Sequence, residues 1–143
     1  MKWHRRFLEL ANHVATWSRD PSTRVGAVVV RPDRTIASMG YNGFPRGVND
    51  TPDRYNERSV KYQFTCHAEA NAIVSAKEDL SRAVLYSSPL HPCNECAKLV
   101  IQSGIKTVVT QAPTEERWAD SFKIASQMFE EAGVEVIYID QNN

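Results

Sequence analysis

The sequence predicts an α/β fold, a three-layer α/β/α sandwich around a five-stranded mixed sheet. Two patterns indicate it: residues 25–41 contain two strand-like segments joined by a turn, and from residue 66 onward helical and strand-like segments alternate. Such alternation is typical of a mostly parallel sheet covered on both faces, to which the initial hairpin adds an antiparallel pair. No repeat or boundary interrupts the pattern, so we expect a single domain over residues 1–143.

The first expected element is an amphipathic helix. Its apolar residues recur at intervals of three and four, which places them on one helical face. They are Trp3, Phe7, Leu10, Val14 and Trp17. We expect the helix to end near Asp20-Pro21, because proline cannot continue a helix.

A hairpin and a long loop should follow this helix. Residues 25–30 (VGAVVV) form a continuous apolar run typical of a buried strand, and residues 35–41 return as a second strand after a turn at residues 32–34. Residues 42–64 contain two prolines, two glycines and little periodicity. We therefore expect a long loop there, and long ordered loops often carry function.

Helices and strands alternate in the rest of the chain. Glycine commonly ends a helix, and Gly104 and Gly133 each follow an apolar periodic segment. The expected elements are a helix over residues 66–77, a strand over 83–86, a helix over 93–103, a strand over 105–110, a helix over 118–132 and a strand over 134–139.

The composition is that of an ordinary globular protein, with 42% hydrophobic and 24% charged residues. Seventeen basic residues balance seventeen acidic ones, which argues against nucleic acid as a partner. No apolar run approaches the roughly 20 residues of a membrane span, and the N-terminus does not resemble a signal peptide. Three cysteines, an odd number, favour free or metal-bound thiols in a cytoplasmic protein.

Two short segments carry residues suited to chemistry, residues 66–69 (CHAE) and 92–96 (PCNEC). A Cys-x-x-Cys pair alone could be a redox pair, half of a zinc ribbon, or chance. The redox interpretation leaves His67 unexplained, and a ribbon needs a second such pair, which the sequence lacks. His67, Cys93 and Cys96 would instead give three ligands and an open fourth position, as in a catalytic zinc site. We expect one Zn²⁺ per chain.

Glu69 follows the expected ligand His67 by two residues. A carboxylate at that place would reach a zinc-activated water without binding the metal. It could take a proton from the water and pass it to a leaving group, so we expect Glu69 to be the catalytic residue. A purely structural zinc site needs no carboxylate there, so Glu69 favours an enzyme over a non-catalytic zinc-binding module.

His67-Ala68-Glu69 followed by Pro92-Cys93-x-x-Cys96 resembles the signature of the zinc-dependent cytidine/deoxycytidylate deaminase superfamily. Within it the chain is most similar to the deoxycytidylate (dCMP) deaminases, from about residue 21 to residue 139. The segments that carry the resemblance are residues 25–28 (VGAV), 40–47 (GYNGFPRG), 67–73 (HAEANAI) and 92–98 (PCNECAK).

The resemblance implies a cytidine-deaminase-like fold and a zinc-dependent hydrolase. Such an enzyme would convert dCMP to dUMP and ammonia with a zinc-activated water, and so supply dUMP for thymidylate synthesis. It also implies a homo-oligomer, a hexamer in preference to a dimer or tetramer, and allosteric control by dCTP and dTTP. Alternatives that stay open are other cytosine substrates: dCTP, 5-methyl-dCMP, deoxycytidine or the free base.

Four further residues are candidates for contacts with the substrate. The resemblance implies that Asn42 bonds the sugar 3′-hydroxyl and that the backbone of Ala68 meets the pyrimidine edge. Arg24 and Arg46 could each hold a phosphate through charge-assisted hydrogen bonds. The alternatives are a turn asparagine and two solvated surface charges.

Overall fold

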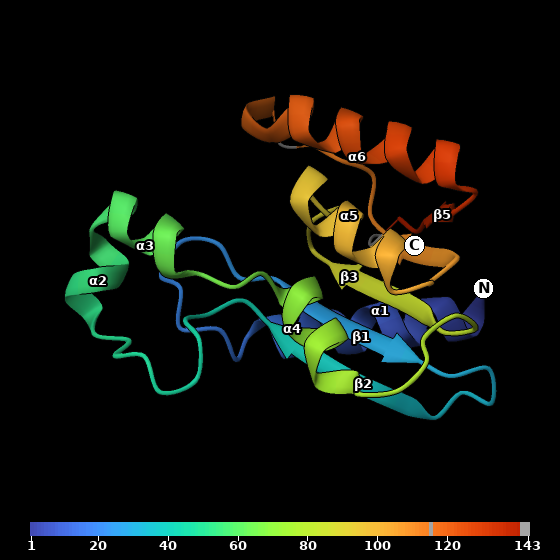
Figure 1. Cartoon of the computed structure of the whole chain (residues 1–143), viewed down its shortest axis with the longest axis horizontal. Coiled ribbons are helices and arrows are strands. Elements are labelled where there is room, and N and C mark those ends of the chain that lie inside the picture. Colours follow the sequence, from blue (N-terminus) through green and yellow to red (C-terminus); the bar gives the residue numbers. More distant parts are fainter. Residues whose placement is uncertain (115, 141–143) are drawn as a thin grey trace.

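The computed structural model describes residues 1–114 and 116–140 of the chain, so the last three residues of the expected domain lie outside it. Within the described residues, five strands form one sheet in the order β2-β1-β3-β4-β5 (Figure 1). The strands are β1 (Gly26–Val30), β2 (Ile36–Tyr41), β3 (Val84–Ser88), β4 (Thr107–Thr110) and β5 (Glu135–Tyr138). Helices cover both faces, so the expected mixed five-stranded α/β sandwich is confirmed.

The strand directions follow from how the chain crosses the sheet. Strand β1 is antiparallel to both of its neighbours, β2 and β3, whereas β3, β4 and β5 are parallel to one another. The connection from β2 passes over β1 and enters the sheet on its far side. Strand β1 therefore lies between two strands of the opposite direction, a second antiparallel pairing that the hairpin alone did not predict.

Helix α1 (Lys2–Ala15) covers one face of the sheet, and three helices cover the other (Figure 1). These three are α4 (Ala68–Ala76), α5 (Asn94–Gln102) and α6 (Ala119–Ala132). Alternate residues of β1 pack in opposite directions: Val28 lies in the core under α1, and Ala27 and Val29 lie in the core under α4. Burial on both faces explains why this strand is a continuous apolar run.

The N-terminal helix is shorter than its apolar spacing predicts. Helix α1 ends at Ala15, so Trp17 lies beyond it with 47% of its surface exposed, and its ring meets the edge of Tyr41. The buried face of the helix instead runs through one aromatic residue and four small or aliphatic ones. They are Phe7, Leu8, Ala11, Val14 and Ala15.

The expectation of one continuous loop over residues 42–64 is wrong. This segment contains two short helices, α2 (Pro52–Asn56) and α3 (Arg58–Phe64), which extend beyond the end of the sheet in Figure 1. Helices of five and seven residues are too short to show a repeating apolar face, so periodicity misses them. Proline at the start of α2 is a usual helix-initiating position.

Helix α4 lies directly on strand β2 because Gly40 has no side chain. A Cβ built at Gly40 would lie 2.5 Å from the carbonyl oxygen of Ala68 and 2.5 Å from the amide nitrogen of Ala72. Both of these atoms belong to the backbone of α4, so the contact leaves no room for a methyl group. Ala68 and Ala72 are fully buried, which brings the N-terminal half of α4 against the sheet.

The described part of the chain also contains no helix with the length and apolar composition needed to cross a bilayer.

Replacing Gly40 with alanine should destabilise the protein by about 1–3 kcal/mol, the usual cost of overpacking a tight contact. The matched control is Gly43→Ala, since the nearest atom to a Cβ there is the Tyr55 hydroxyl oxygen at 3.7 Å. Urea unfolding followed by circular dichroism measures both variants. Equal unfolding midpoints for the two would contradict the close contact between α4 and β2.

Candidate active site

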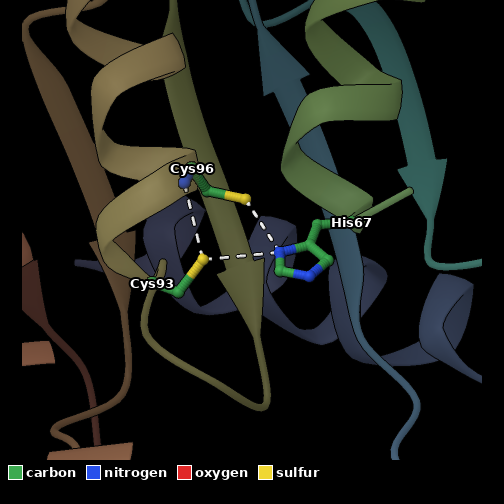
Figure 2. Close-up of side chains that lie close together, drawn as sticks. All are labelled: His67, Cys93 and Cys96. Carbon is green, nitrogen blue, oxygen red and sulfur yellow. Dashed lines mark hydrogen bonds between the residues drawn. The ribbon is translucent and has the colours of Figure 1, made fainter. Parts of the chain in front are cut away.

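Two helix N-termini face each other across the candidate metal centre. His67 is the N-cap residue of α4, and Cys93 is the N-cap residue of α5, with Cys96 in the first turn of that helix. His67 Nδ1 lies 3.2 Å from Cys96 Sγ and 3.4 Å from Cys93 Sγ (Figure 2). The three atoms that could bind a metal all lie within 4.8 Å of one another. The structure therefore brings together the three residues expected to hold zinc.

The donor set and its spacing fit a tetrahedral zinc ion. Zn–N and Zn–S bonds of about 2.0–2.1 and 2.3 Å imply separations of roughly 3.5–3.8 Å between ligand atoms. The observed N–S distances of 3.2 and 3.4 Å are close to this range. Because Nδ1 of His67 faces both sulfur atoms, the neutral ring must carry its proton on Nε2 to act as a ligand. Cys96 is buried, whereas His67 lies on the exposed side of the cluster.

Hydrogen bonds among these side chains shift their pKa values. A hydrogen bond with the Cys96 thiol, followed by one with His67, lowers the pKa of Cys93 and favours its thiolate form. The same hydrogen bond, together with burial, raises the pKa of Cys96. The hydrogen bond to Cys93 raises the pKa of His67. Protons and a metal ion compete for these atoms, so metal binding here must release protons.

Glu69 occupies the second position of α4 and is only 4% exposed. Burial raises the pKa of its carboxyl group to about 7, and the negative charge of Cys93 adds to this shift. A hydrogen bond with its own backbone N–H, the charge of His67 and a hydrogen bond with the Ser87 side chain act in the opposite direction. Both protonation states are therefore accessible near neutral pH, which is what a group that accepts and returns a proton requires.

The cluster lies in a cavity of about 320 Å³, a volume suited to a small-molecule ligand. Its lining includes His67, Glu69 and Cys93, together with Trp118 and Phe122 from the region where α6 begins. The start of α6 is held next to the start of α5, because the Ser121 hydroxyl accepts from the Asn94 backbone N–H and donates to the Asn94 side chain.

Two of the four expected substrate contacts lie at this cavity, namely Asn42 and Ala68. The Asn42 side chain accepts a hydrogen bond from the backbone N–H of Val25 at 2.8 Å and donates one to the carbonyl oxygen of Thr23 at 2.9 Å. This amide therefore holds the start of β1 in place, and it keeps one N–H and one lone pair for other partners.

The two arginines expected to bind phosphate lie elsewhere. Arg24 and Arg46 are exposed, and neither is among the described residues that line the cavity. Arg24 is nevertheless attached to the cavity lining, because its Nε donates to the backbone carbonyl oxygen of Asp20, which does line the cavity.

The cavity also contains residues that the sequence did not single out, above all Lys61 and Asp20. Lys61 belongs to α3, in the segment expected to be a loop, so no pattern placed its side chain near the metal ligands. His91 lines the cavity as well, with its Nδ1 2.8 Å from the carbonyl oxygen of Pro92. Since a carbonyl only accepts, the proton of the neutral ring lies on Nδ1.

Known proteins resemble this chain over most of its length. Residues 1–112 match the family described as "Cytidine and deoxycytidylate deaminase zinc-binding region". An uncharacterized deaminase from Aliivibrio fischeri (luxG 3′ region) is 44% identical over 141 residues, which cover 96% of this chain and 94% of that protein. Mouse deoxycytidylate deaminase is 39% identical over 142 residues, which cover 94% of this chain and 78% of that protein.

Solved structures show the same relationship. The dCMP deaminase of cyanophage S-TIM5, solved in complex with dCMP and dUMP, superposes with a TM-score of 0.74 at 25% identity. The superposition covers 96% of this chain and 97% of the phage protein. A deaminase/reductase from Thermotoga maritima gives a TM-score of 0.71 at 30% identity over 96% of this chain and 36% of its own.

The purified protein should contain one zinc ion per chain, measured by elemental analysis. Cys93→Ser should lose the metal and melt at a lower temperature, because the ion links α4 to α5 and its binding energy contributes to folding. Cys66→Ser is the matched control, since Cys66 lies next to His67 in sequence but outside the three-residue cluster. Two zinc ions per chain, or none after expression with ample zinc, would refute the prediction.

Proposed function

The chain belongs to the cytidine and deoxycytidylate deaminase family, and we propose that it is a zinc-dependent hydrolase that converts dCMP to dUMP and ammonia. The observation that carries the proposal is the buried Glu69 carboxyl beside the cluster of His67, Cys93 and Cys96, inside a cavity that suits a nucleotide base. The choice of the monophosphate is supported by the relatives, which include curated deoxycytidylate deaminases and a phage enzyme in complex with dCMP and dUMP.

We propose that His67 Nδ1, Cys93 Sγ and Cys96 Sγ hold one zinc ion per chain. When bound, the zinc supplies an activated water as the nucleophile for C4 of the cytosine. Glu69 accepts a proton from this water and delivers it to N3 of the base. Glu69 then takes the second proton from the oxygen that has added to C4 and passes it to the amino group, so that the C4–N bond breaks and ammonia leaves. The pKa of Glu69, about 7 because of burial, suits a group that must both take and give a proton.

Asn42 and Ala68 orient the substrate in this proposal. The backbone N–H of Ala68 belongs to the first turn of α4, where amides have no partner within the helix, and it faces the pyrimidine edge. The remaining N–H of the Asn42 amide bonds the sugar hydroxyl. Arg24 and Arg46 remain the proposed phosphate donors, with Arg24 the better placed because it donates to the backbone of Asp20, which lines the cavity.

We also propose a cytoplasmic homo-oligomer, with a hexamer preferred over a dimer or tetramer, and control by dCTP and dTTP. Self-association is supported by large apolar side chains that are exposed on the edge strand β2 and on α4, which packs against it. They are Ile36, Met39, Tyr41 and Val74. The balanced charge of the chain argues against nucleic acid as the substrate.

Deoxycytidine is the second candidate substrate. It is favoured by one observation, that neither of the arginines expected to bind phosphate lines the cavity.

The Glu69→Gln variant should keep its fold and its zinc but lose at least about 10²–10⁴-fold in kcat, since the amide cannot accept the proton. Ammonia release from dCMP measures turnover, and elemental analysis with circular dichroism checks zinc and fold. A variant that keeps about a third of the wild-type activity would show that Glu69 is not the proton shuttle.

The wild-type enzyme should have a kcat/KM for dCMP several orders of magnitude above that for deoxycytidine, because binding energy from the phosphate is used in the transition state. Arg24→Ala and Arg46→Ala should each lower this ratio by about tenfold or more, the value of one charge-assisted hydrogen bond. Equal kcat/KM for the two substrates would reassign the protein as a nucleoside deaminase.

A further inference from the structure

A buried ion pair lines the candidate active-site cavity and is not used by the chemistry described above. Lys61 Nζ lies 3.2 Å from Asp20 Oδ1 and donates a hydrogen bond to Ser22 Oγ at 2.8 Å. The side chains of Lys61 and Asp20 are only 9% and 5% exposed. Buried charged pairs contribute little net stability on average, so the location of this one in the cavity calls for a functional explanation.

The ammonium group of Lys61 has a donor to spare. An ammonium carries three N–H groups. Over residues 1–114 and 116–140, Asp20 and Ser22 are the side chains that accept from Nζ, which leaves one N–H for a ligand in the cavity. Of the Lys and Arg residues among those described, Lys61 is the one that lines this cavity.

Asp20 does not depend on Lys61 for its hydrogen bonds. Its Oδ1 accepts from the backbone N–H of Ser22 at 2.9 Å, from the backbone N–H of Thr23 at 3.1 Å and from the Ser22 hydroxyl at 3.1 Å. The turn over residues 20–23 therefore already holds this carboxylate. Lys61 is therefore not needed to satisfy the Asp20 carboxylate. The carboxylate instead holds the Lys61 ammonium group in one position at the cavity.

The charges at this part of the cavity favour an anion. Arg24 donates from Nε to the backbone carbonyl oxygen of Asp20, so a second cation is attached to the turn whose carboxylate holds Lys61. The other carboxylates that line the cavity are Glu69, beside the metal ligands, and the exposed Glu95. An anionic group is therefore disfavoured near Glu69, whereas at Lys61 it meets an ammonium group with one N–H left to donate.

We propose that Lys61 is a specificity-determining residue that binds the 5′-phosphate of the substrate, with Asp20 as the positioning residue that holds its ammonium group. The inference rests on the proposed function, because it takes the cytosine ring to lie at Glu69 and the phosphate at the opposite end of the nucleotide. Lys61 would thus be a third hydrogen-bond donor to the phosphate, besides Arg24 and Arg46, and it lines the cavity itself.

The test compares kcat/KM for dCMP with kcat/KM for deoxycytidine in three variants. Lys61→Met keeps the length of the side chain and removes its charge, so the dCMP to deoxycytidine ratio should fall about 10- to 100-fold. Lys61→Arg should keep a larger part of the ratio. Asp20→Asn removes the charge that holds the ammonium in place but leaves the ammonium itself, so its ratio should fall by less than that of Lys61→Met.

A double variant separates phosphate binding from support of the fold. Lys61→Met alone leaves Asp20 buried without a counter-ion and could simply unfold. Asp20→Asn combined with Lys61→Met removes both charges, while the amide oxygen at position 20 still accepts from the two backbone N–H groups. If Lys61 binds the phosphate, the double variant keeps the low ratio of Lys61→Met. Restoration of the wild-type ratio would overturn the proposal.

A binding experiment separates this inference from the proposed activity. Calorimetry with dUMP and deoxyuridine measures the contribution of the phosphate without any turnover. The wild type should bind dUMP more tightly, and Lys61→Met should lose about 10- to 100-fold of that preference. If the wild type does not deaminate dCMP, the proposed function fails, yet this loss would still support a phosphate site. An unchanged preference for dUMP in Lys61→Met would overturn the site, whatever the enzyme deaminates.

Discussion

The backbone of α4 rests on β2 through Gly40, and the position of the active site depends on this contact. With no Cβ between them, the helix lies as close to the sheet as backbone atoms permit, and the buried Ala68 and Ala72 keep it there. His67 and Glu69 belong to the first residues of this helix, so the height of α4 above the sheet sets where both side chains point. A metal site whose ligands come from two helices requires the helices to be placed accurately, because metal–ligand distances vary by only about 0.2 Å.

The other half of the cluster is supplied by local geometry. Cys93 is the N-cap of α5 and accepts a hydrogen bond through its sulfur from the backbone N–H of Cys96 at 3.5 Å. A helix N-terminus favours negative charge, so two such ends facing each other suit two thiolates and a cation between them. Glu69 lies in the first turn of α4 but is deeply buried, and burial outweighs the helix in setting its pKa near 7.

The sequence predicted those parts of the site whose geometry is local. His67 and Glu69 are two residues apart, and Cys93 and Cys96 share one helical turn, so their spacing alone brought each pair together. The sandwich was predicted from the hairpin and from the alternation of helical and strand-like segments, and the apolar run predicted to be a buried strand is β1, which is buried along its whole length. Lys61 could not be found in this way, because α3 is too short to show periodicity and its contact with Asp20 joins residues 41 positions apart. Arg24 and Arg46 were chosen for their charge, which says nothing about which way a side chain points.

The residues that line the cavity differ in how far they can be replaced without disturbing the fold, as Asn42 shows. Its amide donates to Thr23 and accepts from Val25, and among the common side chains of this length only asparagine offers both groups: aspartate lacks the donor and leucine lacks both. A replacement at this position would disturb the entry of the chain into β1 before it could alter the choice of substrate. Trp118, which also lines the cavity, is held instead by ring contacts with Phe122 and Arg117. In related enzymes with other substrates, we therefore expect replacements at cavity residues such as Trp118, with Asn42 unchanged.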